Sequence, residues 1–481
     1  MNKIKKYFEE VSYLRGIQSL LYWDMETMMP SGAINDRAQR LSYVQSKIHE
    51  LITHKKLDKF IQELSHKKTK QEKRLFEELN WDFQLNKRLP VKHVEEVVRV
   101  STLATHVWAD ARKRNDFKSF LPHLQKLIDL KKKESSYFNY ARPYDYLIKL
   151  HDKEFDSQRI NKIFSELKNG LLDLVEDVKI DGRFVKIKDP KGPFSIDEQK
   201  KLSEMVARLF GLPENNSRLD TSTHPFSINI SPRDQRITTR YDLDHLDSFS
   251  STMHEVGHAL YELNLPSQWE GTPLAEAASM SIHESQSRFW ENIIGRSKEF
   301  CVYLLPHMKK HFPKSFAKTN EEDLFLMMNK SVPGLIRVES CELYYNFHVI
   351  IRFEIEELIF NQGLKAKDIP KIWNEKYRDY LGLIPSTESQ GVLQDSHWAG
   401  GAFGYFPTYT LGNLISGSLY QKLKKQEPNL SRQIANGKFE KPLKVLKSKV
   451  HQHGRMINSK DLVGDLSSKD YLKYLREKFG V

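Results

Sequence analysis

The chain has 481 residues, of which 39% are hydrophobic and 29% are charged, and its formal net charge is +12. This length allows a large buried core, and no stretch approaches the roughly 18 apolar residues of a membrane-spanning helix. The basic residues are dispersed among apolar ones at helical spacing, which is typical of solvated helix faces and argues against nucleic-acid binding as the main role. Cys301 and Cys341 are the only cysteines, so we expect no disulfide framework and a reducing, cytoplasmic setting.

Residues 1–180 are predicted to form successive helices. Segments such as RAQRLSYVQSKIHELIT repeat apolar residues at intervals of three and four. The first residues are charged throughout and show neither the apolar core nor the cleavage site of a secretory signal. We therefore expect them to form an amphipathic helix of the mature protein.

The pattern changes over residues 181–242, where Gly and Pro interrupt short runs that alternate between apolar and polar residues. The run HPFSINISPRDQRITTRYD predicts a few antiparallel strands. From residue 243 to residue 481 the spacing is helical again, apart from a Gly/Pro-rich stretch at 399–413. No linker is long enough to separate independent domains, so the sequence predicts one helical domain over residues 1–481 with two lobes.

The segment STMHEVGHALYE, residues 251–262, predicts a metal-binding helix. The helix expected over 249–264 has one apolar stripe, formed by Met253, Val256, Leu260 and Leu263. Residues four apart lie on the same helix face, so His254 and His258 can point at one metal ion. Glu255 lies slightly further round, where it can act as a general base on water that the metal activates. A chance match to so short a motif is the alternative, and a third ligand would decide against it.

The segment GTPLAEAASMSIHESQSRFWENI, which begins at Gly271, offers that third ligand. Pro273 is a suitable first residue of a helix. On this helix one face would be shared by Ala277, Ser281 and Glu284. Glu284 would then complete a site of two histidines and one carboxylate, while His283 points elsewhere, beside the site or into the core. Glu276 either orients a ligand histidine or lies exposed on the surface.

Six short motifs occur in order along the chain: HPF at 224–226, DQRIT at 234–238, HEVGH at 254–258, HESQS at 283–287, IRVES at 336–340 and GVLQDSHW at 391–398. Together with LYWDMETMMP near the start and GYFPTYTLGN after the last motif, they resemble the M32 family of metallocarboxypeptidases, the carboxypeptidase Taq family. The resemblance covers essentially the whole chain.

The resemblance implies an almost entirely α-helical, two-lobed fold with a deep cleft, similar to neurolysin and angiotensin-converting enzyme, in which short strands line the cleft. It also implies a homodimer that releases single residues from peptide C-termini with broad specificity. By matching motifs, the implied Zn²⁺ ligands are His254, His258 and Glu284, and the implied general base is Glu255. One Zn²⁺ per chain is expected, with Co²⁺ as a possible substitute.

Other site residues are expected from the same resemblance. A carboxypeptidase needs a cation for the substrate carboxylate, and Arg337 is the first candidate and Arg236 the second. A structural salt bridge is the alternative for either arginine. Donors for the developing oxyanion are expected from His397, Tyr405 and Tyr409, although buried aromatic residues more often belong to a core.

Two positions depart from the family pattern. Ser340 and Cys341 stand where the motif usually has Ala-Asp, which removes a carboxylate near Arg337 for which Glu339 or Glu342 could compensate. Val256 replaces a small residue inside the metal motif, and we expect it to be tolerated because it belongs to the apolar stripe. Three alternatives therefore stay open: a dipeptidyl carboxypeptidase or endo-oligopeptidase, a catalytically impaired peptide binder, and a nucleic-acid-binding protein.

Overall fold

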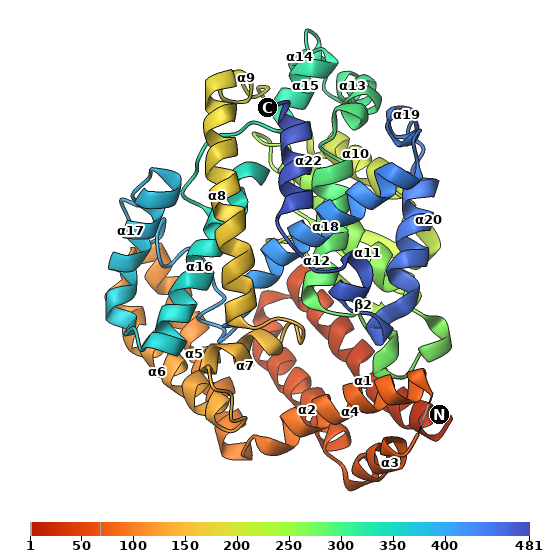
Figure 1. Ribbon diagram of the computed structural model, residues 1–481, viewed down its shortest axis with the longest axis vertical. Helices are drawn as coiled ribbons and strands as arrows, with labels where there is room; N and C mark the ends of the chain where they lie inside the picture. Colours follow the sequence, from red (N-terminus) through yellow and green to blue (C-terminus); the bar gives the residue numbers. More distant parts are fainter. Residues whose placement is uncertain (1, 68) are drawn as a thin grey trace. The chain divides into compact units, whose positions relative to one another are not determined.

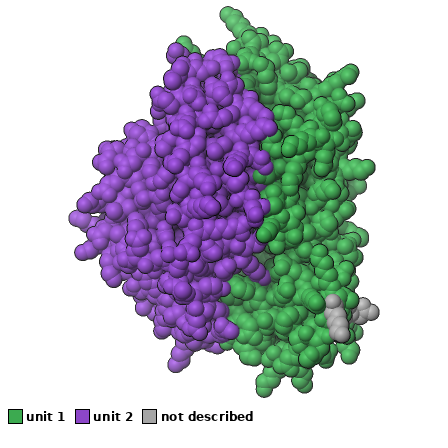
Figure 2. Space-filling view, viewed as in Figure 1, with its two compact units in different colours: residues 1–87, 188–325, 416–464 green, residues 88–187, 326–415, 465–481 purple. Residues whose placement is uncertain are grey.

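The computed structural model describes residues 2–67 and 69–481 (Figure 1). It is mainly helical with one small three-stranded sheet, which confirms the predicted fold class. The chain divides into two compact units, each made of three separate segments (Figure 2). Unit 1 comprises residues 1–87, 188–325 and 416–464, and unit 2 comprises residues 88–187, 326–415 and 465–481. The expected cleft and the similarity to neurolysin and angiotensin-converting enzyme stay predictions.

Unit 1 contains the N-terminal helices, the sheet and the predicted metal-binding helix. Its α-helices are α1 (Asn2–Thr27), α2 (Ile34–Ile52), α3 (Lys55–Ser65), α4 (Lys70–Arg88), α10 (Ile196–Leu209), α11 (Asp247–Leu263), α12 (Met280–Arg288), α13 (Lys298–His311), α14 (Pro313–Phe316), α15 (Glu321–Met328), α19 (Leu430–Ala435), α20 (Glu440–Lys449) and α21 (Ser459–Val463). Its short 3₁₀ helices are η1 (Ser31–Ala33), η2 (Glu214–Asn216), η3 (Ser267–Trp269), η4 (Pro273–Ala275) and η8 (His451–Met456), and a π-helix, η5 (Phe289–Ile294), follows α12. Helices α4 and α15 end just beyond the boundary with unit 2.

The sheet consists of β1 (Ser217–Thr221), β2 (Ser227–Ser231) and β3 (Asp234–Thr239), in the order β1-β3-β2. Strands β2 and β3 are antiparallel, as predicted, but β1 and β3 are parallel. The prediction of a purely antiparallel sheet was therefore wrong. The chain reverses direction once between β1 and β2 and again between β2 and β3, so the central strand β3 runs in the direction of β1.

Part of the segment predicted as strands is helical. Within residues 181–242, α10 occupies Ile196–Leu209, and the first strand begins only at Ser217. The buried side of α10 includes Leu202 and Val206, which are four residues apart and share a helix face. The apolar residues of this stretch do have helical spacing. The Gly and Pro residues that precede it led to the prediction of strands instead.

Helix α11 forms where the sequence predicted a metal-binding helix, and it packs against β3, α10 and α12. Met253, Val256 and Leu260 of its apolar stripe are fully buried. The approach of α11 to α12 depends on Gly257, because a Cβ atom there would lie 2.5 Å from Ser287 Cα. The histidine-bearing face of α11 is therefore held close to α12.

Unit 2 is built around α16 (Glu342–Gln362), which is buried over most of its circumference, as expected for a helix at the centre of a core. Helices α6, α7, α8 and α17 contact α16. The remaining helices of this unit are α5 (Val91–Arg114), α6 (Phe117–Ser136), α7 (Pro143–Lys149), α8 (Ser157–Asp181), α9 (Arg183–Lys186), α17 (Ile369–Leu381) and α22 (Lys469–Phe479), with 3₁₀ helices η6 (Arg337–Glu339) and η7 (Ala366–Asp368). Helix α18 (Pro407–Gln426) begins in unit 2 and continues into unit 1. Among the described residues no helix is long and apolar enough to cross a membrane.

Candidate active site

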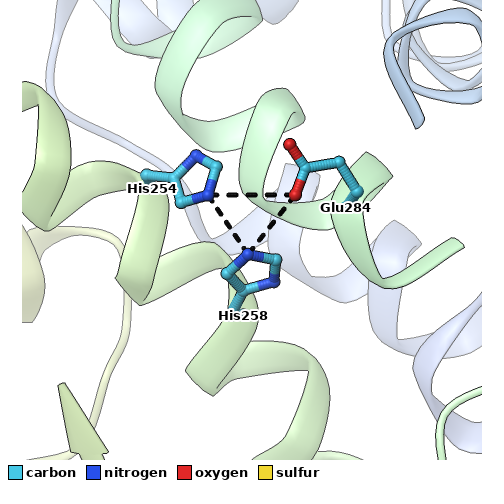
Figure 3. A group of neighbouring side chains, drawn as sticks. All are labelled: His254, His258 and Glu284. Atoms are coloured by element: carbon cyan, nitrogen blue, oxygen red, sulfur yellow. Dashed lines mark hydrogen bonds and ion pairs between the residues drawn. The ribbon is translucent and has the colours of Figure 1, made fainter. Parts of the chain in front are cut away.

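Three of the predicted site residues converge in unit 1 (Figure 3). His254 and His258 extend from successive turns of α11, and their Nε2 atoms lie 3.2 Å apart. Glu284 extends from α12, and its Oε2 lies 3.9 Å from Nε2 of His254 and 3.6 Å from Nε2 of His258. The i, i+4 spacing on α11 and the close packing of α12 therefore bring these three ligand atoms toward one point.

This donor set fits a metal ion. Nδ1 of His254 lies 2.8 Å from Oε2 of Glu291, so Nδ1–H donates to that carboxylate and Nε2 keeps its lone pair. That lone pair faces Nε2 of His258 at a distance typical of two ligands around a common cation. Burial favours the neutral form of His254, yet the negative charge of Glu284 and the contact with Glu291 raise its pKa. A positive charge at this place is therefore favoured, and two histidines with one carboxylate suit zinc.

The sequence analysis missed the charged groups that surround Glu284. Oε1 of Glu284 accepts a hydrogen bond from Nε of Arg288 at 2.7 Å. Glu291 accepts from Nη1 of Arg288 at 3.1 Å and from Nη2 of Arg296 at 3.0 Å. Burial opposes the charge on Glu291, but these arginines and His254 hold its pKa well below the ordinary value. The i, i+4, i+7 spacing of Glu284, Arg288 and Glu291 was a detectable signal, because such residues share a helix face.

Glu255, the predicted general base, is a buried carboxyl group on α11, directly after His254. Burial raises its pKa to about 7, although the nearby His254 opposes this shift. The negative charges of Glu284 and Glu291 raise the pKa further. A carboxyl group with a pKa near neutrality is suited to exchange a proton with a reacting group.

His283 lies beside the three converging residues, as expected, and is not one of them. Its ring is stacked on that of His258 with a centroid distance of 4.4 Å. Its Nε2 lies 2.9 Å from Oε1 of Glu262, and Oε2 of Glu262 accepts from Asn229 of β2 at 2.9 Å. Contacts from α11 and β2 therefore fix the ring that covers His258.

Glu276 is half-buried, and its carboxylate binds Arg15 and Arg455. The expectation that it lies exposed on the surface was therefore wrong, and the expectation that it orients a ligand histidine stays a prediction. The helix predicted from Pro273 also does not form: η4 ends at Ala275, and the backbone at Glu276 is extended. Helix α12 begins at Met280, because the side chain of Ser279 accepts the backbone N–H of Ile282 as an N-cap.

Arg337, the predicted carboxylate binder, lies in unit 2 and is buried. Its Nε donates to Oδ1 of Asp395 at 3.0 Å, and its Nη1 donates to the hydroxyl of Tyr345 at 2.9 Å. Oδ2 of Asp395 accepts from Nε of Arg352 at 2.7 Å. Although burial opposes its charge, Arg352 and Arg337 hold the pKa of Asp395 well below the ordinary value. The carboxylate that accompanies Arg337 is thus Asp395 of the GVLQDSHW motif.

Neither acid suggested as a replacement takes that place. Glu342 is buried and binds Nζ of Lys478 at 2.6 Å, and the side chain of Arg337 binds Asp395 and Tyr345 rather than Glu339. Cys341 precedes α16, and its Sγ lies 3.9 Å from the carbonyl oxygen of Val332. Neither Cys301 nor Cys341 forms a disulfide bond. The unusual Ser340-Cys341 pair therefore leaves the ion pair of Arg337 in place.

His397, Tyr405 and Tyr409 gather with Arg337 in unit 2. Nε2 of His397 lies 3.1 Å from the Tyr409 hydroxyl, and the rings of Tyr405 and Tyr409 are 5.3 Å apart. The guanidinium of Arg337 lies 5.0 Å from the ring centre of Tyr409, within range of a cation–π interaction. Burial, together with the nearby charge of Arg337, lowers the pKa of His397 to about 3, so this ring is neutral at physiological pH.

A buried carboxyl group that the sequence analysis missed holds the Gly-rich stretch in place. Glu356 of α16 is fully buried and accepts hydrogen bonds from Trp398 Nε1 at 2.6 Å, the backbone N–H of Gly404 at 2.8 Å and the Tyr144 hydroxyl at 2.7 Å. Gly404 has φ +81°, and a Cβ atom there would lie 2.4 Å from the backbone of Leu147. Both features fix the loop that carries His397 and Tyr405.

Arg236, the second candidate for the substrate carboxylate, lies on β3 in unit 1. Its Nε and Nη2 already bind Asp234, at 2.5 and 2.8 Å. Its guanidinium also lies 4.7 Å from the ring centre of Trp23 on α1. The structure therefore places Arg236 in a forked ion pair over an aromatic ring, which is the alternative that the sequence analysis left open for it.

Comparison with known proteins agrees with these motifs. Residues 3–479 match the family model of the carboxypeptidase Taq (M32) metallopeptidases. Thermostable carboxypeptidase 1 of Pyrococcus furiosus is 35% identical over 475 residues, which cover 96% of this chain and 95% of the relative. Carboxypeptidase 1 of Bacillus subtilis is 34% identical over 488 residues, which cover 99% of this chain and 97% of the relative.

A solved structure of a Pyrococcus furiosus carboxypeptidase has a TM-score of 0.96 at 34% identity, and the match covers 99% of this chain and 98% of that chain. The similarity in sequence and in structure thus extends over nearly the whole length. The chain therefore belongs to the carboxypeptidase Taq (M32) family and is a metallocarboxypeptidase.

Proposed function

We propose that this enzyme is a zinc-dependent carboxypeptidase that releases single amino acids from the C-termini of short peptides with broad specificity. The observation that carries the proposal is the convergence of His254, His258 and Glu284, with the buried Glu255 on the same helix. His254, His258 and Glu284 would hold one Zn²⁺, which Co²⁺ could replace. Bound there, the metal would lower the pKa of water and polarise the scissile carbonyl.

Glu255 supplies the proton transfer in this proposal. Its carboxylate removes a proton from the attacking water and then passes it to the nitrogen of the leaving amino acid. The buried position of Glu255 excludes bulk water from that proton. Glu291 supports the reaction by keeping the His254 ring in one orientation through the 2.8 Å hydrogen bond to Nδ1.

The residues of unit 2 are proposed to act on the substrate. Arg337 would bind the C-terminal carboxylate through its remaining donor capacity, with Asp395 holding the guanidinium in place. His397, Tyr405 and Tyr409 would donate hydrogen bonds to the oxyanion that develops on the carbonyl. Arg236 is the weaker candidate for the carboxylate, because Asp234 already occupies its fork.

The partners are proposed from the family alone. Short peptides are the substrates, and the enzyme acts in the cytoplasm as a homodimer with no role for nucleic acid or a membrane. Neither cysteine forms a disulfide bond, which accords with a reducing compartment.

The proposal is tested by following free amino acids released from a short peptide with a blocked N-terminus. Wild type and Glu255→Gln are compared after the zinc bound to each has been measured. We expect single residues to appear in order from the C-terminus, and the variant to keep its zinc while losing at least about a hundredfold in rate. Release of dipeptides, or of internal fragments, would instead identify a dipeptidyl carboxypeptidase or an endo-oligopeptidase.

A peptide binder without catalysis is the remaining alternative. It predicts that the wild type binds zinc and peptide but releases no amino acid. The intact donor set and Glu255 favour catalysis over this alternative, and the ion pair between Arg337 and Asp395 persists beside Ser340-Cys341.

A further inference from the structure

The two carboxylate oxygens of Glu284 have different partners. Oε2 lies 3.9 Å from Nε2 of His254 and 3.6 Å from Nε2 of His258. Oε1 instead accepts a hydrogen bond from Nε of Arg288, one helical turn further along α12, at 2.7 Å. One oxygen is thus directed at the metal-binding point, and the other is held by a guanidinium.

Arg288 also reaches a second ligand indirectly. Its Nη1 donates to Oε2 of Glu291 at 3.1 Å, and the same oxygen accepts the Nδ1–H of His254 at 2.8 Å. A single planar guanidinium therefore contacts Glu284 directly and His254 through Glu291. The fork of an arginine can hold two acceptors in a fixed geometry, which a lysine ammonium cannot do.

The hydrogen bonds of Arg288 to Glu284 and Glu291 are largely shielded from solvent. The side chains of Arg288, Glu284 and Glu291 are only 13%, 8% and 10% exposed. Charged hydrogen bonds that are shielded from water are stronger than those at the surface. Without such a bond the terminal torsion of a glutamate is broad and roughly two-fold, so both oxygens could turn toward one cation.

We propose that Arg288 is a positioning residue that makes Glu284 a ligand through one oxygen only. By occupying Oε1, Arg288 keeps the second oxygen away from the metal and leaves one coordination position for the reaction. Catalytic zinc sites keep such a position open, whereas a carboxylate bound through both oxygens would add a fifth ligand and crowd that position. This inference rests on the metal site proposed above.

The test uses the full chain loaded with Co²⁺, with the cobalt bound per chain measured separately. The visible absorption per bound cobalt decreases as the number of ligands increases. For Arg288→Met, which keeps an unbranched side chain and removes the guanidinium with its hydrogen bonds, we expect this absorption to fall by at least about twofold, as five ligands replace four.

Arg296→Met is the matched control, because Arg296 also binds Glu291, whereas the arginine that binds Glu284 is Arg288. It removes the same charge from the same neighbourhood, and its absorption is expected to equal that of the wild type. Arg288→Lys is expected to stay near the wild type, since an ammonium group can still occupy one oxygen of Glu284.

An unchanged spectrum for Arg288→Met overturns the proposal. An equal fall in the absorption per bound cobalt in Arg288→Met and Arg296→Met also overturns it. The loss of a positive charge near Glu291, rather than the contact with Glu284, would then explain the change. The wild type gives a second test that does not depend on the folding of a variant: a crystal structure with zinc bound through both oxygens of Glu284 also overturns it. None of these measurements needs a peptide substrate, so their outcome is separate from that of the proposed peptidase activity.

Discussion

Arg337 and Asp395 form a buried ion pair, with Nε of the arginine 3.0 Å from Oδ1 of the aspartate. The other carboxylate oxygen of Asp395 binds Arg352 through Nε at 2.7 Å and through Nη2 at 2.6 Å. One carboxylate therefore compensates two buried guanidinium groups. Because Nε and Nη1 of Arg337 are held by Asp395 and Tyr345, the orientation of the guanidinium is fixed before any substrate binds.

Asp395→Asn is expected to destabilise the enzyme strongly. The substitution removes the negative charge and leaves Arg337 and Arg352 buried without compensation, a change that typically costs about 3–5 kcal/mol. Urea unfolding at pH 7 measures the change. Asp379→Asn is the control in the same unit, because its pair with Arg378 is exposed on both sides and should contribute less than about 1 kcal/mol. Equal costs for the two variants would contradict the assigned role of Asp395.

Glu356 makes the stability of the wild type depend on pH. Burial raises the pKa of Glu356 from 4.5 to about 7, so the folded state binds its proton more tightly than the unfolded state does. The contribution of Glu356 to stability is therefore complete below about pH 4.5 and is lost as the pH rises through about 7. The glutamine side chain of Glu356→Gln does not titrate, so this variant lacks the contribution. We expect the unfolding free energy of the wild type, relative to this variant, to decrease between these two pH values.

Urea unfolding at several pH values measures that difference, because all other titrating groups cancel between the two proteins. Parallel stability profiles would show that the carboxyl group ionises in the folded protein as it does in the unfolded chain.

Glu356→Gln also places an amide N–H₂ among three donors, from Trp398, Gly404 and Tyr144. We therefore expect slower peptide hydrolysis at unchanged metal content, since the loop that carries His397 loses a fixed anchor.

Gly257→Ala is expected to weaken metal binding although it changes no ligand. The added Cβ would lie 2.5 Å from Ser287 Cα and 2.6 Å from the carbonyl oxygen of Gln286. Helix α12, which carries Glu284, must then move away from His258. We expect a loss of about 1–3 kcal/mol in unfolding free energy, as for other overpacked contacts, and at least about tenfold weaker binding of Zn²⁺ in a chelator competition.

Gly32→Ala is the matched control for this substitution. Gly32 lies in the same unit, and nothing lies within 4 Å of the position of its added Cβ. Its stability is expected to stay within about 0.5 kcal/mol of the wild type, with unchanged zinc affinity. If Gly257→Ala binds zinc as tightly as Gly32→Ala does, the close approach of α11 and α12 does not set the metal geometry.

Local periodicity made part of the site predictable. His254 and His258 share a helix turn, so their spacing alone brought their rings together, and the small residues expected at the helix contact led to Glu284. Arg288 and Glu291 followed the same periodicity and could have been predicted. Asp395 and Glu356 could not, because their partners lie far away in the chain and only the packing of unit 2 brings them together.

The sheet and α12 illustrate the same limit in the fold. Alternation of apolar and polar residues predicted strands around Ile228 and Ile237, but it contains no information on which strand becomes the central one. Two residues in this segment are suited to the start of a helix, Pro273 and Ser279. In the structure Pro273 begins only the short η4, and Ser279 is the N-cap of α12. The backbone at Glu276 is extended, and its carboxylate binds Arg15 and Arg455, so no α-helix continues from Pro273 into α12.

Removal of the metal is expected to lower the melting temperature. Without a cation, Nε2 of His254 and Nε2 of His258 lie 3.2 Å apart beside the negative charge of Glu284, and nothing compensates that charge at the point where the three groups converge. A metal that binds only the folded chain adds about 2.7 kcal/mol when its free concentration is a hundred times its dissociation constant. Calorimetric scans of chelated and zinc-loaded protein measure the difference. His258→Ala should abolish it, and His311→Ala, which alters a histidine paired with Glu198 in the same unit, should retain it. A melting temperature that is equal with and without bound metal would mean that these three side chains do not hold the ion.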